Sequence, residues 1–207
     1  MEQQRPNEYL PIEEDERGSY IMNSKDLELL PYLRELAEAG VDSFKIEGRV
    51  KSSYYVAVVT GVYRKAVDCL YECPEDFEEQ LPLWLEELRT VSHRQYTGGF
   101  IEGKPTAADH RYETSAYERL YDFVAVVRGY DAEKQQLVLE QRNHFALGET
   151  LEFVPPKGEP FEIRLTEMHD EFGASIDKAP HAQMTVTVPA KQPTEPMTIV
   201  RRKCHGM

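Results

Sequence analysis

The hydrophobic pattern of this 207-residue chain changes its period near residue 115. Before that point apolar residues recur every three or four positions, which is typical of amphipathic helices. After it they alternate with polar residues, as Phe161 and Ile163 alternate with Glu162 and Arg164. Because neither pattern fits the other's secondary structure, the sequence predicts two domains, a helix-containing one over 1–114 and an all-β one over 115–207.

The first domain is predicted to be an α/β unit with a parallel strand. We expect helices over 24–39, over 53–70 and from 74 onward, a strand over 41–46, and a loop over 92–114. Pro31 and Pro82 should each interrupt a helix, because proline lacks the N–H that the helix needs. Gly40 is placed to end the first helix.

The second domain contains six segments with strand character, separated by glycine- and proline-rich breaks. The segments are 122–128, 136–141, 150–154, 161–168, 182–188 and 197–201. Short antiparallel strands at this spacing favour a small barrel that closes its own edges.

Composition excludes several classes of protein. With 24 basic against 37 acidic side chains the net charge is −13, which argues against generic binding of nucleic acid over the whole surface. No segment approaches the ~20 apolar residues of a membrane span, so we expect no membrane partner. The polar first 20 residues do not resemble a signal peptide and suggest an exposed arm or a cut edge of a larger domain. Three cysteines without paired spacing indicate a cytoplasmic protein without structural disulfides.

The first candidate site follows the predicted strand 41–46. Ligands bind at the carboxyl ends of parallel strands in α/β sheets and barrels, and charged residues crowd this end. Arg49 could clamp an anion, and Glu47 could act as a base or orient Arg49. The further ligand-binding candidates are Lys45, Lys51, Ser52 and Tyr54. The alternative is a solvated turn with ordinary ion pairs.

Two further groups could contact RNA. His93, Arg94 and Tyr96 lie in a loop that also bears glycines, a mixture suited to anions or stacked bases. Arg201 and Arg202 form a basic edge near the C-terminus. The alternative for the loop is ordinary packing over a barrel end.

We predict no metal site in this chain. Cys204 and His205 are adjacent, but two ligands alone do not make a site. Cys69 and Cys73 are four residues apart on a predicted helix, and a buried apolar pair is the better interpretation.

Several blocks resemble the collagenase-like U32 peptidase family. They are Asn23-Ser24-Lys25-Asp26-Leu27, the run from Glu38 to Ser52, Tyr54-Tyr55-Val56-Ala57, Thr97-Gly98-Gly99-Phe100 and the run from Gly148 to Glu152, with Ala179-Pro180-His181 and Arg201-Arg202 after them. The resemblance implies an α+β fold: the C-terminal fragment of a (β/α) TIM-type barrel, then a small antiparallel β-barrel similar to elongation factor Tu domain 2. It also implies that the missing N-terminal part of the barrel is a partner of this chain.

The resemblance implies one of two activities. One is collagenase-like proteolysis, for which the sequence offers no HExxH or GxSxG motif. The other is tRNA uridine C5 hydroxylation by members thought to hold an iron–sulfur cluster. One cluster cysteine of those members corresponds to Glu28 here, so we expect no cofactor in this chain.

The leading hypothesis is therefore the C-terminal segment of a U32 peptidase-like protein that acts in tRNA hydroxylation, with tRNA as substrate. The alternatives are a collagenase-like protease with a peptide substrate, and a β-barrel module that docks RNA or protein without catalysis.

Overall fold

The structure is a computed structural model that describes residues 13–15, 18–20, 25–101, 103–104 and 117–204. The chain divides into two compact units. Unit 1 comprises 1–45 and 63–118, and unit 2 comprises 46–62 and 119–207. The predicted boundary at 114/115 lies outside the described residues.

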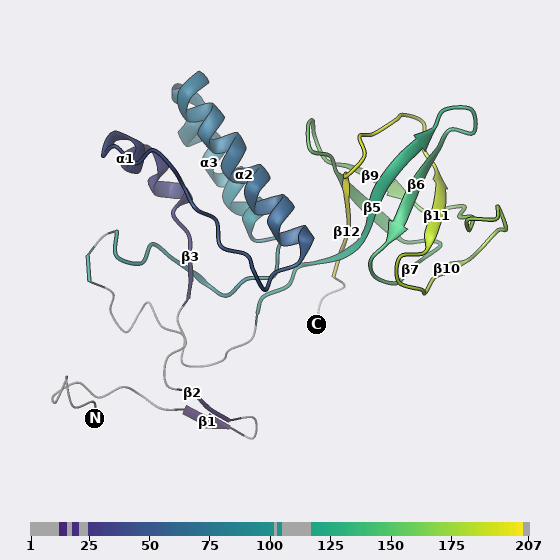
Figure 1. Ribbon diagram of the computed structural model, residues 1–207, viewed down its shortest axis with the longest axis horizontal. Helices are drawn as coiled ribbons and strands as arrows, with labels where there is room; N and C mark the ends of the chain where they lie inside the picture. Colours follow the sequence, from purple (N-terminus) through teal and green to yellow (C-terminus); the bar gives the residue numbers. More distant parts are fainter. Residues whose placement is uncertain (1–12, 16–17, 21–24, 102, 105–116, 205–207) are drawn as a thin grey trace. The chain divides into compact units, whose positions relative to one another are not determined.

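Unit 1 contains the helices and two small sheets. Its elements are β1 (Glu13–Asp15), β2 (Gly18–Tyr20), β3 (Asp26–Leu27), the 3₁₀ helix η1 (Leu30–Tyr32), α1 (Leu33–Glu38), the second half of α2 (Ser53–Glu72), the 3₁₀ helix η2 (Pro74–Asp76), α3 (Phe77–Leu88) and β4 (Tyr96–Thr97). Strands β1 and β2 form an antiparallel pair, and β3 and β4 form a parallel pair. Figure 1 labels α1, α2, α3, β1, β2 and β3.

The first predicted helix begins later than expected. Residues 26–27 form strand β3 instead of a first helical turn, and Pro31 lies at the start of η1, where its missing N–H is not needed. Gly40 ends the helix at φ 86°, as predicted. The apolar residues from Leu27 to Leu33 follow a helical period. However, Asp26 and Leu27 pair with β4, 70 residues away, and a local pattern cannot reveal such a partner.

Three other expectations for this half were wrong. Residues 41–46 form no strand, and no described strand pairs with them. Helix α3 continues through Pro82 without a break, since Phe77, Trp84 and Leu88 anchor its buried face on both sides of the proline. The segment 92–114, expected to be loop, contains β4.

Unit 2 is built on a six-stranded antiparallel sheet, and all six predicted strand segments are present. The strands are β5 (Tyr121–Asp131), β6 (Gln136–Gln141), β8 (Thr150–Val154), β9 (Phe161–Arg164), β11 (Thr185–Pro189) and β12 (Ile199–Lys203), in the order β11-β6-β5-β12-β8-β9. A second small sheet pairs β7 (Phe145–Ala146) with β10 (Lys178–Ala179).

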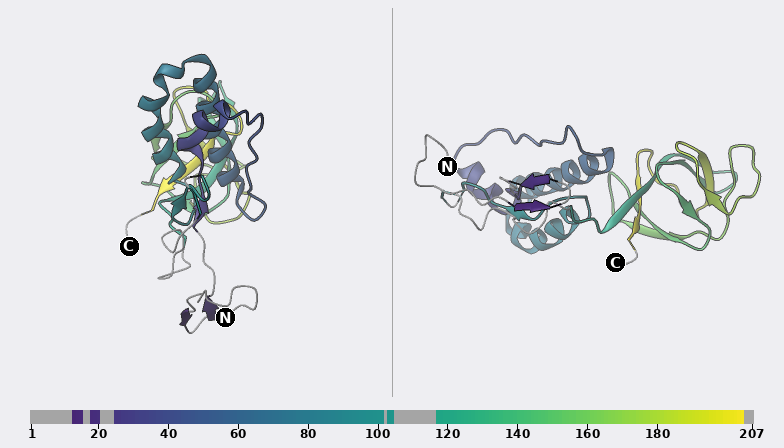
Figure 2. Two further views of the ribbon diagram at one scale, coloured as in Figure 1. Left: turned by 90° about the vertical axis from the view of Figure 1, so that its left-hand side faces the viewer. Right: turned by 90° about the horizontal axis from the view of Figure 1, so that it is seen from below.

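The six-stranded sheet curls around one apolar core, as Figures 1 and 2 show. Inward residues of the strands are fully buried, among them Val124, Leu139, Phe153, Val186 and Val200. β9 and β11 are the outer strands of the sheet, and the expected closure is only partial: a single bridge joins His169, which follows β9, to Thr187 of β11. The domain is therefore a curled antiparallel half-barrel. The TIM-type barrel fragment expected before it is not confirmed, because the only parallel pairing among the described residues is the two-stranded pair β3–β4.

Candidate functional site

The charged residues of the first predicted site lie at the surface. Glu47 and Arg49 form an ion pair with 2.8 Å between Oε1 and Nε, and their side chains are 58% and 82% exposed. Lys45 is exposed as well, so the cluster does not line a barrel interior. An ion pair in this position contributes only ~0–1 kcal/mol to stability. The geometry therefore favours the solvated-turn alternative.

Two neighbouring candidates have local structural roles. The Ser52 Oγ accepts a hydrogen bond from the backbone N–H of Tyr55 at 3.2 Å, which caps the start of α2. The Lys51 ammonium lies 5.0 Å from the centroid of the Tyr55 ring. Both contacts fix the entry into the helix.

Tyr54 and Arg201 meet in a buried cluster of unit 2. The Tyr54 ring stacks on Phe123 with 5.7 Å between centroids, and its hydroxyl accepts a hydrogen bond from Arg201 at 3.3 Å. The Arg201 Nε donates to Glu152 at 2.7 Å, and its guanidinium lies 4.5 Å from the centre of the Tyr121 ring. Arg201 is 2% exposed, so it cannot form the basic surface edge that the sequence suggested.

Arg202 is also engaged by carboxylates. It donates to Asp122 at 2.8 Å and to Glu149 at 2.7 Å. Burial would raise the pKa of Asp122, but the hydrogen bond from Arg202 and the charges of Arg119 and Arg202 outweigh it and hold that pKa below its usual value. These pairs join β12 to β5 and to the turn before β8.

His93, Arg94 and Tyr96 hold the parallel pair of unit 1 together. Arg94 bonds Asp26 through both its backbone N–H and its guanidinium, each at 3.0 Å. The His93 ring stacks on Tyr96 at 4.4 Å, and its Nδ1 donates to the Arg94 carbonyl at 2.7 Å. Its buried Nε2 has no hydrogen-bond partner among the described residues.

A different carboxylate, Glu28, lies where an α/β fold places its chemistry. Glu28 directly follows β3, and its backbone N–H donates to the Thr97 carbonyl at 2.9 Å. The carboxyl ends of β3 and β4 therefore meet here, which is the edge at which parallel sheets bind ligands. Within the described residues the buried Oε1 of Glu28 has no hydrogen-bond partner.

The environment of Glu28 favours its protonated form. Burial raises the pKa of this carboxyl, and the positive charge of Arg89 offsets only part of that effect. A carboxyl whose pKa is raised by burial keeps its proton to higher pH than an exposed one, which suits a general acid or base.

The turn after β4 forms the other side of this edge. Gly99 has φ 62°, and a Cβ there would lie 2.8 Å from the Leu27 side chain. A Cβ on Gly98 would lie 3.0 Å from atoms of Tyr32 and Ile101. A side chain at either position would crowd these neighbours, and the positive φ of Gly99 also favours glycine there.

The sequence patterns did not single out Glu28 as a candidate site residue. They placed it in the first turn of a predicted helix, because the apolar stripe begins at Leu27. The signal that could have found it is the combination of an acidic residue after Asp26-Leu27 with the Thr97-Gly98-Gly99-Phe100 turn, two blocks that the parallel pairing brings together.

An iron–sulfur cluster does not fit the residues that the structure describes. Within them no group of three or more His, Cys, Asp or Glu side chains converges. The Sγ atoms of Cys69 and Cys73 are 3.2 Å apart, and burial together with the neighbouring thiol raises the pKa of Cys69 to about 11. Cys204 belongs to the other unit, and His205 lies outside the described residues. The helices that the structure describes include none with the length and apolar character of a membrane span.

Comparisons with known proteins agree along nearly the whole chain. The model of peptidase family U32 matches residues 1–111, and the model of the family's C-terminal domain matches residues 119–201. The tRNA hydroxylation protein P1 of Bacillus subtilis is 37% identical over 188 residues, which is 91% of this chain and 44% of that protein.

Two more relatives are a second tRNA hydroxylation protein and a collagenase. The tRNA hydroxylation protein P of Escherichia coli is 38% identical over 94% of this chain and 42% of its own length. A collagenase of Porphyromonas gingivalis is 35% identical over 51% of this chain and 25% of its own length. The chain thus spans less than half the length of the relatives that it matches.

Proposed function

Because the chain belongs to peptidase family U32, we propose that it is the C-terminal part of a cytoplasmic protein that acts in tRNA uridine C5 hydroxylation. The observation that carries this proposal is the 37% identity to a tRNA hydroxylation protein across 91% of the chain. The collagenase relative matches only half of the chain, so proteolysis is the weaker candidate.

The proposal includes further parallel strands beside β3 and β4. Parallel sheets are normally covered on both faces and are rarely two strands wide. Leu27 of β3 is 64% exposed, and Phe100 after β4 is 79% exposed. Strands from the longer polypeptide that the relatives possess would complete this sheet and bury those side chains.

Glu28 is the residue that we propose for the chemistry. In a completed barrel it would lie at the carboxyl ends of the strands, where it can hold or move a proton during reaction at the uridine base. Arg89 would assist by placing a positive charge near the anionic substrate. We propose no cofactor for the part of the chain that the structure describes.

The test is replacement in the complete protein. We expect deletion of the gene to remove from cellular tRNA the uridine derivative that is one oxygen heavier, as measured by nucleoside mass spectrometry. Wild-type protein should restore it, and Glu28→Gln should not, although it accumulates to the same level. Arg49→Ala, which alters only the surface pair, is the matched control and should restore it fully.

Two outcomes would contradict the proposal. Unchanged tRNA nucleosides after deletion would remove tRNA hydroxylation as the function. Hydrolysis of gelatin by the purified complete protein, abolished by Glu28→Gln, would assign the same site to a peptidase.

A further inference from the structure

The open edge of the half-barrel carries unpaired backbone groups. In unit 2, β9 pairs with β8 along one side only, with Arg164 opposite Thr150 and Glu162 opposite Glu152. The backbone N–H and carbonyl of Leu165 both bond toward the β8 side. Because these directions alternate along an antiparallel strand, the corresponding groups of Glu162 and Arg164 point away from β8. The described residues provide them with no hydrogen-bond partner.

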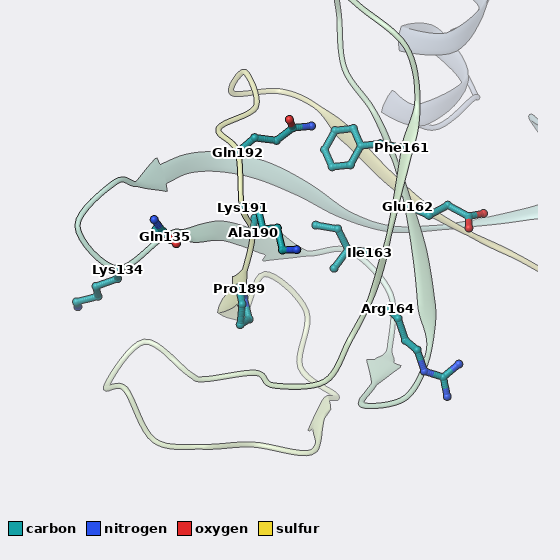
Figure 3. Close-up of a pocket in the computed structure, with 10 residues that line it drawn as sticks. All are labelled: Lys134, Gln135, Phe161, Glu162, Ile163, Arg164, Pro189, Ala190, Lys191 and Gln192. Carbon is teal, nitrogen blue, oxygen red and sulfur yellow. The ribbon is translucent and has the colours of Figure 1, made fainter.

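A groove of about 660 Å³ runs along this edge. Figure 3 shows Phe161 and Ile163 pointing across it toward the segment 189–192. Pro189 and Ala190 form the apolar part of the opposite wall. In the same view Glu162 and Arg164 point to the other face of β9.

We propose that this groove binds an extended peptide segment of a partner protein, which adds to β9 as a further antiparallel strand. Its alternate side chains would be apolar, facing Phe161 and Ile163 inside the groove. Its outward side chains would be acidic opposite Arg164 and basic opposite Glu162. The proposal does not depend on the proposed tRNA function.

A peptide fits better than the other classes of occupant. The edge offers both donors and acceptors in alternation, which complement a peptide backbone, whereas a phosphate backbone only accepts. The Phe161 ring is already stacked on Phe153 at 5.2 Å, so it is not a free platform for a base. In a second copy of this chain, β9 is already paired with β8, so β8 would have to enter the groove beside it. A groove with two walls accommodates a single strand more readily.

Charge around the groove favours an occupant with an acidic residue. Lys134, Arg164 and Lys191 line it together with one acidic residue, Glu162, in a chain whose net charge is −13. These cations are exposed, so they can approach the outward side chains of a bound strand.

The test uses two fluorescein-labelled peptides of identical composition and the full 207-residue chain. The first, Val-Glu-Val-Lys-Val, places Glu opposite Arg164 and Lys opposite Glu162 when it pairs antiparallel. The second, Val-Lys-Val-Glu-Val, reverses both charges. We expect the first to bind more tightly by about 3- to 30-fold in fluorescence anisotropy, since two cross-strand charge pairs differ between them.

The double variant Glu162→Arg/Arg164→Glu supplies the decisive control. It retains the composition and the apolar face of β9, and it should reverse the preference between the two peptides. N-methylation of the Glu and Lys amides of the first peptide should abolish binding, because those N–H groups face β9. An unchanged melting temperature of the double variant verifies that the fold is retained.

Several results would overturn the proposal. These are no binding of either peptide, a preference that the double variant does not reverse, or binding that tolerates the N-methyl groups. A single-stranded RNA that binds while both peptides fail would make the groove an RNA site. Dimerisation of the chain that Arg164→Glu abolishes would assign the edge to a second copy.

Discussion

Glu28 and Glu152 are two carboxylates withdrawn from water in different ways. Glu152 accepts a 2.7 Å hydrogen bond from Arg201, so its negative charge is compensated. Glu28 has one oxygen with no hydrogen-bond partner among the described residues, and burial raises its pKa. A compensated carboxylate stabilises the fold, whereas an uncompensated one opposes folding when it ionises. The first arrangement is typical of structure and the second of a functional site.

Glu28→Gln should stabilise the protein increasingly as pH rises. The unfolded carboxyl titrates near ~4.3, and the folded pKa is higher, so the folded state binds the extra proton between those values. Wild-type stability therefore falls as pH rises through the folded pKa, and the glutamine variant escapes this loss. The melting temperatures of wild type and Glu28→Gln, measured from about pH 3.5 to 8, should diverge above about pH 4, with the variant melting at the higher temperature. Arg89→Gln in the wild-type background should move the decline to higher pH, and parallel curves for all three proteins would refute the assignment.

Arg201→Ala should destabilise unit 2 strongly, in contrast with Arg49→Ala. Removing Arg201 deletes its ion pair with Glu152 and its hydrogen bond to the Tyr54 hydroxyl, at a cost of about 2–4 kcal/mol. Partial contact of Glu152 with water keeps the cost from being larger. The exposed Arg49 pair should change stability by less than ~1 kcal/mol. Urea unfolding of both variants measures the difference, and equal effects would show that Arg201 is not the structural anchor described here.

The elements predicted correctly are those whose signal lies within the element itself. The six strands of unit 2 follow from alternation along each strand, and α2 follows from the helical period of Val58, Val62 and Ala66. Strand β3 and the absence of a strand at 41–46 depend on partners distant in sequence, which no local pattern encodes. The extent of barrel closure was unpredictable for the same reason, because alternation fixes the faces of a strand but not its neighbours.

The candidate site was less predictable than the fold. The Lys45–Arg49 cluster satisfied the rule that chemistry follows a parallel strand, but the strand in question is absent. Applied to β3, the same rule leads to Glu28. The rule itself was therefore usable, but the pairing of β3 with β4, which decides where it applies, could not be predicted from the sequence.

Helix α3 offers a direct measure of how packing overrides propensity. Pro82 removes the hydrogen bond to the Glu78 carbonyl, yet the helix continues because buried residues hold it on both sides. Pro82→Ala should therefore stabilise the protein by about 1–3 kcal/mol, the cost that an interior proline normally imposes. Pro74→Ala at the start of η2, where proline is tolerated, should be neutral or slightly destabilising. Denaturant unfolding compares them, and a destabilised Pro82→Ala would mean that the ring itself contributes packing.

At the scale of the whole molecule, α2 is shared between the two units. Residues 53–62 belong to unit 2, and residues 63–72 belong to unit 1. The β half-barrel is therefore not continuous in sequence, because an earlier helical segment packs into it through the contact between Tyr54 and Arg201, which are 147 positions apart. A fragment cut at the change of hydrophobic period would lose that segment.

Tyr54 tests whether this recruited segment supports unit 2 alone. Tyr54→Ala removes the ring stacked on Phe123 and should cost about 3–5 kcal/mol, as truncation of a buried aromatic residue does. Tyr54→Phe keeps the ring, removes the hydroxyl that accepts from Arg201 and should cost about 0.5–1.5 kcal/mol. Amide hydrogen exchange should show the loss of protection in β5 and β12, while α3 keeps its rates. Equal loss of protection in α3 would mean that the two units unfold as one, and the half-barrel would then owe its stability to the whole chain rather than to the segment 46–62.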